Sequence, residues 1–137
     1  MSADLNRVSH KFSKNERLCS RKIFDLLINS GEQFFTHPFK VIYCYHALSY
    51  IQEPLQVAFV VPKRIFKKAH DRNRIKRLMR EAFRIQKNEL KQAMFNQPKK
   101  LAVLIIFVNK TLTPYHEVES KIKLILHRLK MVHAQGN

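Results

Sequence analysis

The 137-residue chain is poor in several residue types from which functional sites are commonly built. It has only two glycines, Gly31 and Gly136, so it cannot form the glycine-rich phosphate loops of Walker-type NTPases or Rossmann dinucleotide-binding domains. Its two cysteines, Cys19 and Cys44, stand far apart and form no CxxC pair. We interpret them as free thiols of a protein in a reducing cytosol, where they act as small hydrophobic residues.

Acidic residues are also scarce, with ten Asp and Glu against 26 Lys and Arg. They are scattered, with no pair at a catalytic spacing and no DxD or HExxH motif, and the seven histidines show no metal-ligand spacing. The sequence therefore predicts no catalytic residue and no metal site on the protein itself. A stand-alone nuclease is disfavoured for the same reason, because a two-metal centre needs a cluster of carboxylates.

Long hydrophobic runs are missing. The longest run, residues 101–108, has the length of a strand, whereas a helix that crosses a bilayer needs about 18–20 apolar residues. The N-terminal stretch MSADLNRVSHKF lacks the apolar core of a signal peptide. We therefore expect a cytoplasmic protein.

Positive charge, in contrast, is abundant. The net charge is +16 with histidine neutral, while hydrophobic residues make up 45% of the chain, which is enough for the core of one domain. A charge of this size opposes compaction unless a polyanion neutralises it. Nucleic acid is the first candidate partner, and an anionic membrane surface is the second.

The charge is concentrated in residues 63–87, which hold eleven of the 26 basic residues against two acids, Asp71 and Glu81. From Arg72 to about Phe95 this stretch predicts one helix, because apolar residues recur at three- and four-residue steps. The apolar positions are Ile75, Leu78, Met79, Ala82 and Ile85. The opposite side carries Arg72, Asn73, Lys76, Arg77, Arg80, Arg84 and Lys87. A solvated helix face usually mixes charge signs, so this pattern favours an anionic partner over a merely solvated basic face.

The start of this helix points the same way. Asp71 is the predicted N-cap, which places Arg72 and Arg74 in the first turn, where the helix dipole disfavours cations. A bound phosphate would reverse that preference, because helix N-termini and guanidinium groups both bind anions.

The remaining elements follow from periodicity and turn residues. A short helix begins at the N-cap Ser20 and ends at Gly31. Residues 39–45 and 56–61 are rich in β-branched and aromatic residues and are predicted to pair as an antiparallel hairpin, with an earlier short strand at residues 34–35. Residues 101–108 are apolar on both faces and predict a central strand.

A last helix opens at Thr113-Pro114. Its predicted core stripe is Val118, Ile122, Ile125, Leu126 and Leu129. The order α-β-β-β-α-β-α predicts an α+β fold, an α/β sandwich of helices on a mostly antiparallel sheet. We expect a basic N-terminal arm at residues 1–19, a single α/β domain at 20–133 and a tail at 134–137.

Aromatic residues suggest the kind of nucleic acid. If one face of the sheet is open, aromatic side chains beside cations would form a platform for stacking unpaired bases. The candidates are Phe24, Phe39, Tyr43 and Phe59, and each of them is also consistent with a place in the core.

The segment KKAHDRNRIKRLMREAFR, residues 67–84, resembles the RNR motif in the protein subunit of bacterial ribonuclease P. RKIFDLLINSG is similar to that family's first helix with its glycine stop, and VAFVVPKR to the strand that leads into the basic helix. The resemblance covers residues 18–129. It implies a fold like domain 2 of ribosomal protein S5, with an unusual left-handed βαβ crossover.

The resemblance also implies a function. The partners would be a catalytic RNA subunit and precursor tRNA, with no membrane and no obligatory protein partner. The RNA subunit and its bound Mg²⁺ would remove the 5′ leader, and the protein domain would bind both RNAs. The implied RNA-binding residues are Lys63, Arg64, Lys67, Lys68, Arg72, Asn73, Arg74, Lys76, Arg77, Arg80 and Arg84. The implied leader-binding cleft comprises Phe24, Ile28, Phe39, Tyr43 and Phe59.

The sequence departs from the family pattern in three places. Ile28 stands where many members have a second aromatic residue, the stretch 58–61 reads AFVV where Gly-Leu-Ser/Thr-Val is usual, and Pro62 replaces a small residue. These departures bear on the shape of the cleft and not on the basic helix. A basic structural protein of the ribosome or nucleoid, without a catalytic role, is the alternative that explains the net charge equally well.

Overall fold

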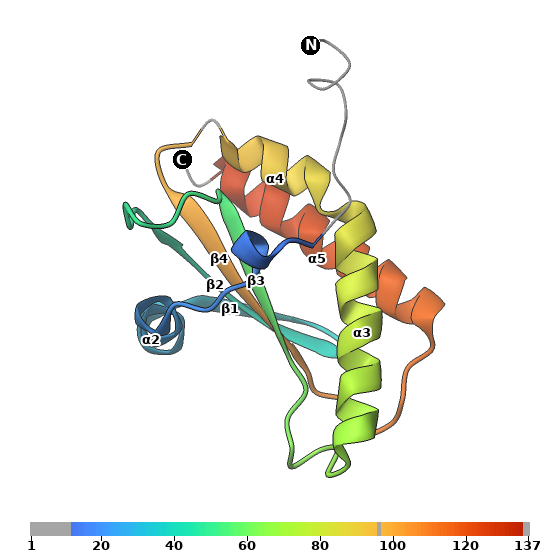
Figure 1. Cartoon of the computed structure of the whole chain (residues 1–137). Coiled ribbons are helices and arrows are strands. Elements are labelled where there is room, and N and C mark those ends of the chain that lie inside the picture. The colour runs from blue at the N-terminus through green and yellow to red at the C-terminus, as the bar shows by residue number, and fades with distance from the viewer. Residues whose placement is uncertain (1–11, 96, 136–137) are drawn as a thin grey trace.

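The computed structural model describes residues 12–95 and 97–135 of the chain, and the side chains among them as far as Val132. In chain order its elements are η1 (Lys14–Glu16), α2 (Arg21–Ser30), β1 (Glu32–Thr36), β2 (Phe39–His46), β3 (Leu55–Val60), α3 (Ala69–Gln86), α4 (Asn88–Phe95), β4 (Lys100–Phe107) and α5 (Tyr115–Gln135). The predicted α+β class and element order are confirmed, and α4 is an addition to them. Helices α3, α4 and α5 lie on one side of the sheet and α2 on the other (Figure 1).

The four strands lie in the order β1-β2-β4-β3. Strand β2 runs antiparallel to both β1 and β4, whereas β3 runs parallel to β4. The predicted hairpin between β2 and β3 is therefore wrong: Tyr43 of β2 and Val57 of β3 face Val103 of β4 from its two sides. Strand β4 takes the central place, as predicted, because residues 101–105 are apolar and buried on both faces.

Alternation along β4 divides the core into two layers. Leu101, Val103 and Ile105 belong to the larger cluster, which includes the buried residues of α3, α4 and α5. Ala102 and Leu104 belong to the smaller cluster under α2. The five predicted core residues of α5 are all buried, so its periodic pattern identified the correct face.

Helix α2 ends at a glycine for a steric reason. Ser20 caps the helix and accepts a hydrogen bond from the Ile23 amide at 3.4 Å. At the other end, a Cβ atom on Gly31 would lie 2.5 Å from the Leu27 carbonyl oxygen and 2.7 Å from Cγ2 of Ile42. Only glycine permits so close an approach of the helix end to β2.

The single helix predicted to run from Arg72 to about Phe95 is two helices, which meet at Lys87. Sequence periodicity placed Lys87 on the cationic face, but its side chain is only 1% exposed. The correction has an electrostatic cause, because the Lys87 ammonium donates to both carboxylate oxygens of Glu16, at 2.6 and 2.8 Å. The apolar stripe is also turned slightly, with Phe83 buried and Ile85 on the surface.

Glu16 is the centre of a buried ion cluster that holds the N-terminal segment, residues 12–19, on the domain. Lys91 of α4 reaches Glu16 at 2.8 Å and Glu53 at 3.1 Å. Burial alone would raise the pKa of the Glu16 carboxyl, but the hydrogen bonds from Lys87 and Lys91 outweigh it and lower the pKa to about 2.

The backbone adds to this attachment. The Leu18 amide donates to the Val57 carbonyl at 3.1 Å, and the Leu18 side chain is buried. Residues 12–19 of the predicted arm are therefore packed on the domain, while residues 1–11 lie outside the described residues. At the other end, α5 extends to Gln135, into the predicted tail.

The ion cluster predicts a specific acid sensitivity. Glu16→Gln leaves the Lys87 ammonium buried without its counter-charge, and we expect a loss of roughly 3–5 kcal/mol in the free energy of unfolding near neutral pH. Because the folded-state pKa lies below the ordinary value of 4.5, the stabilisation is present above that value and is lost as the pH falls toward 2. The difference between wild type and variant should therefore shrink by about 3 kcal/mol over this interval.

Denaturant unfolding at a series of pH values measures this difference. Glu81→Gln is the matched control, because it removes the same charge from an exposed ion pair and should change stability little. If Glu16→Gln is as stable as Glu81→Gln, the assignment of Glu16 to a stabilising buried ion cluster is refuted.

Candidate nucleic-acid interface

Helix α3 turns its apolar side toward the core and its basic side outward. Ile75, Met79 and Phe83 are buried, which fixes the rotation of the helix and leaves the cations on the opposite side. Of the predicted RNA-binding residues, eight are exposed: Lys63, Arg64, Lys67, Lys68, Asn73, Arg74, Arg77 and Arg80. Three are half-buried: Arg72, Lys76 and Arg84. We call these eleven residues the basic surface; they come from α3 and from the loop between β3 and α3.

The protein's own acids neutralise little of this surface. In the described part of the chain, Arg84 is the single member that forms an ion pair with a carboxylate, at 2.6 Å from Glu81. The Arg84 hydrogen bond lowers the pKa of the Glu81 carboxyl, and Glu81 in turn raises the pKa of the guanidinium. The exposed cations of the basic surface therefore present their charge to solvent, as expected of a surface that binds a polyanion.

The start of α3 differs from its prediction. The helix begins at Ala69, with Lys68 at the N-cap and no capping side chain, so Asp71 lies within the first turn. Arg72 folds back and donates to the carbonyl oxygens of Phe66 and Lys67 at 2.7 and 2.8 Å. Arg72 therefore has a partner in the loop and braces it, whereas Arg74 stays exposed.

The predicted cleft residues do not lie together. Phe39, Tyr43 and Phe59 belong to the cluster covered by α3 and α5, and Phe39 packs edge-on against Phe107 at 5.8 Å. Phe39 and Tyr43 are buried, and Phe59 is half-buried against Phe12 and Phe83, so the structure does not bring these three into an open cleft with Phe24 and Ile28. Alternation along a strand identified two faces correctly, but it could not tell which face the helices would cover.

Phe24 and Ile28 lie on α2, on the other face of the sheet (Figure 1). Phe24 is half-buried against the smaller cluster and Ile28 is 70% exposed. The sheet beside α2 is incompletely covered, because Ala58, Val60 and Ile106 are only half-buried.

Two further residues of this face were not predicted. Phe35 of β1 is 64% exposed, and the Lys40 ammonium lies 5.9 Å from its ring centroid. In the strand register, Lys40 of β2 pairs with Ile106 of β4, and Ile106 pairs with Val60 of β3. We call Phe24, Ile28, Phe35, Lys40, Val60 and Ile106 the open sheet face. The signal that could have identified these two residues is the pairing of Phe35 with Lys40 across β1 and β2. That pairing can be recognised only when the strand register is known.

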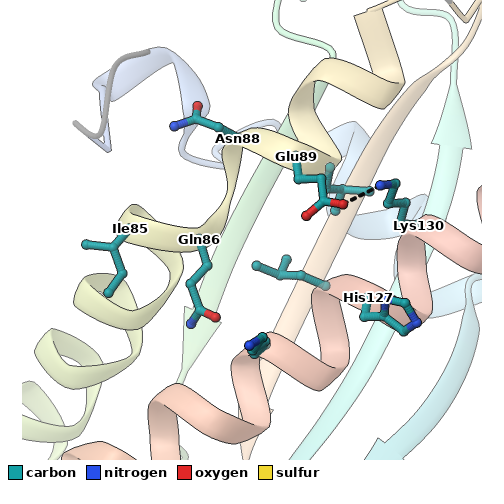
Figure 2. A pocket seen from close by; sticks show the side chains of 9 residues that line it. Ile85, Gln86, Asn88, Glu89, His127 and Lys130 are labelled. Atoms are coloured by element: carbon teal, nitrogen blue, oxygen red, sulfur yellow. Dashed lines mark hydrogen bonds and ion pairs between the residues drawn. The ribbon is translucent and has the colours of Figure 1, made fainter.

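A hollow of about 500 Å³ lies where the α3–α4 junction meets α5 (Figure 2). The Gln86 side chain donates to the backbone carbonyl oxygens of Ala82 and Glu119, and Lys130 of α5 pairs with Glu89 of α4. These bonds join the helices, so we assign the hollow a structural role.

Two absences among the described residues bear on the class of site. Among the residues that the structure describes, no three His, Cys, Asp or Glu side chains gather closely enough to hold a metal ion. In the same part of the chain, no helix combines the length and the apolar character needed to cross a bilayer.

Known proteins share both the sequence and the fold. The sequence profile described as Ribonuclease P matches residues 12–130. The ribonuclease P protein component of Porphyromonas gingivalis strain W83 is 30% identical over 120 residues, which cover 85% of each chain. That of Legionella pneumophila strain Lens is 37% identical over 73 residues, 53% of this chain and 60% of the relative.

Two solved structures agree. The ribonuclease P protein from Thermotoga maritima superimposes with a TM-score of 0.63 at 25% identity, over 82% of this chain and 96% of that one. The protein from Staphylococcus aureus, at 18% identity, shares the fold with a TM-score of 0.64, over 84% of this chain and 95% of that one.

An α+β sandwich that displays unneutralised cations along one helix is a nucleic-acid-binding domain by architecture and charge. With the match over residues 12–130, the assignment becomes specific. The chain belongs to the ribonuclease P protein family, and the resemblance found at the RNR motif is confirmed.

The Glu81–Arg84 pair predicts a gain of binding. Glu81→Gln removes the acid that pairs with Arg84 and so leaves the basic surface with one more uncompensated positive charge. We expect tighter binding to a structured RNA and a salt dependence steeper by about one phosphate contact. Filter binding at several salt concentrations measures both quantities. Glu117→Gln, at an exposed acid in the first turn of α5, is the matched control, and equal effects of the two variants would contradict the prediction.

Proposed function

We propose that this chain is the protein subunit of a ribonuclease P holoenzyme, in which it binds a catalytic RNA subunit and assists removal of the 5′ leader from precursor tRNA. The observation that carries the proposal is the basic surface, since eight of its members are exposed and, in the described chain, only Arg84 is paired with an acid. A row of such charges suits phosphates spaced along a folded RNA.

The RNA subunit carries the chemistry in this proposal. Mg²⁺ is held mainly by that RNA, where it stabilises the charge that develops during phosphodiester hydrolysis. The protein supplies cations that bring RNA segments together and reduce their mutual repulsion. It acts in the cytoplasm, without a membrane and without an obligatory protein partner.

The open sheet face is the proposed contact for the 5′ leader. A single-stranded leader exposes its bases, which stack on aromatic side chains and pack on apolar ones. Phe24 and Ile28 keep the role predicted for them, whereas Phe35 and Lys40 take the places predicted for Phe39, Tyr43 and Phe59. Phe35 offers an exposed ring and Lys40 a cation beside it, so one base and its phosphate could be bound together.

Reconstitution tests the proposed function. Mixed with a bacterial ribonuclease P RNA at low Mg²⁺, the protein should accelerate precursor tRNA cleavage, and the protein alone should not cleave. Arg80→Ala should weaken binding to the RNA subunit and flatten its salt dependence by about one contact. Arg21→Ala, on α2 at the other face of the sheet, is the control and should bind as wild type does. Cleavage by the protein alone, or failure to assist any such RNA, would refute the proposal.

Leader binding has its own test. Phe35→Ala should reduce the preference of the holoenzyme for precursor tRNA over mature tRNA by roughly 5- to 100-fold, the range typical of one stacked base. Phe95→Ala is the matched control, because Phe95 of α4 is similarly exposed, at 61% against 64%. Equilibrium binding of both tRNA forms to the holoenzyme gives the ratio. Indifference of the wild-type complex to the leader would favour a basic structural protein instead.

A further inference from the structure

We propose that the N-terminal segment and α3 together form a pocket for one unpaired nucleotide of the bound RNA. Phe12 and Arg17 would contact the base, and Arg77 and Arg80 the phosphate. This inference rests on the proposed function, and it adds two residues to the RNA-binding set that lie outside the basic surface.

The pocket is a hollow of about 440 Å³ between these two parts of the chain. It is lined by Phe12, Ser13, Arg17, Arg77, Arg80, Glu81 and Arg84. Four of the seven residues are arginines, and the one acid, Glu81, is already paired with Arg84. Arg17, Arg77 and Arg80 form no ion pair in the described part of the chain, so the hollow attracts an anion.

One wall of the hollow is aromatic. The Phe12 ring packs edge-on against Phe59 at 5.8 Å and against Phe83 at 5.5 Å, while remaining only half-buried. The Arg17 guanidinium carbon lies 5.6 Å from the Phe12 ring centroid. Aromatic rings and guanidinium planes are the two kinds of surface on which proteins stack unpaired bases.

The segment that carries Phe12 and Arg17 is fixed before any ligand binds. Glu16, next to Arg17, is held by Lys87, and the Asn15 carbonyl accepts a hydrogen bond from the Gln56 side chain at 2.8 Å. The backbone of Arg17 also forms a parallel β-bridge with Val57 of β3. Because the backbone is already ordered, binding costs little conformational entropy.

The combination of groups selects a nucleotide over other anions. A free phosphate or an acidic peptide would satisfy the arginines but would leave the aromatic wall unused. A base within a duplex is already stacked between its neighbours and cannot enter the hollow without unpairing. An unpaired nucleotide uses both the cations and the ring, and a folded RNA offers such nucleotides in its loops and bulges.

Charge-conserving substitution separates this pocket from general electrostatics. Arg17→Lys keeps the charge but loses the planar guanidinium, so it should weaken binding to the RNA subunit nearly as much as Arg17→Ala, by roughly 5- to 100-fold. Arg21→Lys and Arg21→Ala are the matched controls and should both bind as wild type does. If Arg17→Lys binds as wild type does, or if the Arg17 and Arg21 variants behave alike, the pocket is refuted.

A second measurement identifies the ligand. In the full-length protein, the backbone amide signals of Ser13 and Arg17 should shift in NMR spectra on titration with AMP or a short single-stranded RNA. Phe12→Leu should abolish these shifts, and its thermal unfolding shows whether the fold is intact. Equal shifts with inorganic phosphate would reduce the pocket to an anion site and overturn the assignment to a base.

The two proposals fail differently. If the wild-type protein assists no ribonuclease P RNA but AMP still shifts these signals, the proposed function fails and the pocket stands. If the RNA is bound and assisted while the Arg17 variants bind as wild type does, the pocket alone fails.

Discussion

The central place of β4 is the constraint on which the rest of the structure depends. A strand that is apolar on both faces must be covered on both, so the chain builds a layer of three helices on one side and places α2 on the other. β2 and β3 flank it, although they are consecutive in sequence. The connection from β3 to β4 runs through α3, and the apolar face of α3 packs against this core. The basic side of α3 therefore faces outward, where it is available to a polyanion.

Periodicity predicted the elements and the buried side of α5, because each depends on residues within a few turns or pleats. It failed where a distant residue decided the outcome. Lys87 matches the cationic face by spacing, yet Glu16 draws it into the interior. Phe39, Tyr43 and Phe59 match an aromatic platform by alternation, yet the helices that cover them are encoded elsewhere in the chain. The RNR motif, in contrast, could be located from sequence alone, because its charges depend on no distant residue: Arg74 is exposed, and Arg72 bonds to the adjoining loop.

The three proposed RNA contacts are divided between the two sides of the sheet. The basic surface and the nucleotide pocket belong to the side that carries α3, and the open sheet face belongs to the side that carries α2 (Figure 1). In the proposed function, the sheet would lie between a catalytic RNA on the α3 side and a leader on the α2 side, and the exposed cations of the β3–α3 loop follow directly after β3. The protein can therefore hold two polyanions at once without bringing their charges into direct contact.

The attachment of the N-terminal segment has a consequence for biosynthesis. Phe12 and Glu16 leave the ribosome early, but their partners Phe59, Phe83 and Lys87 follow much later, and the Glu16–Lys87 pair joins residues 71 positions apart. The segment must stay undocked until α3 has been translated and packed. A nascent chain that carries only the first half of the domain lacks Phe83 and Lys87, so the proposed nucleotide pocket forms only after α3 has been translated.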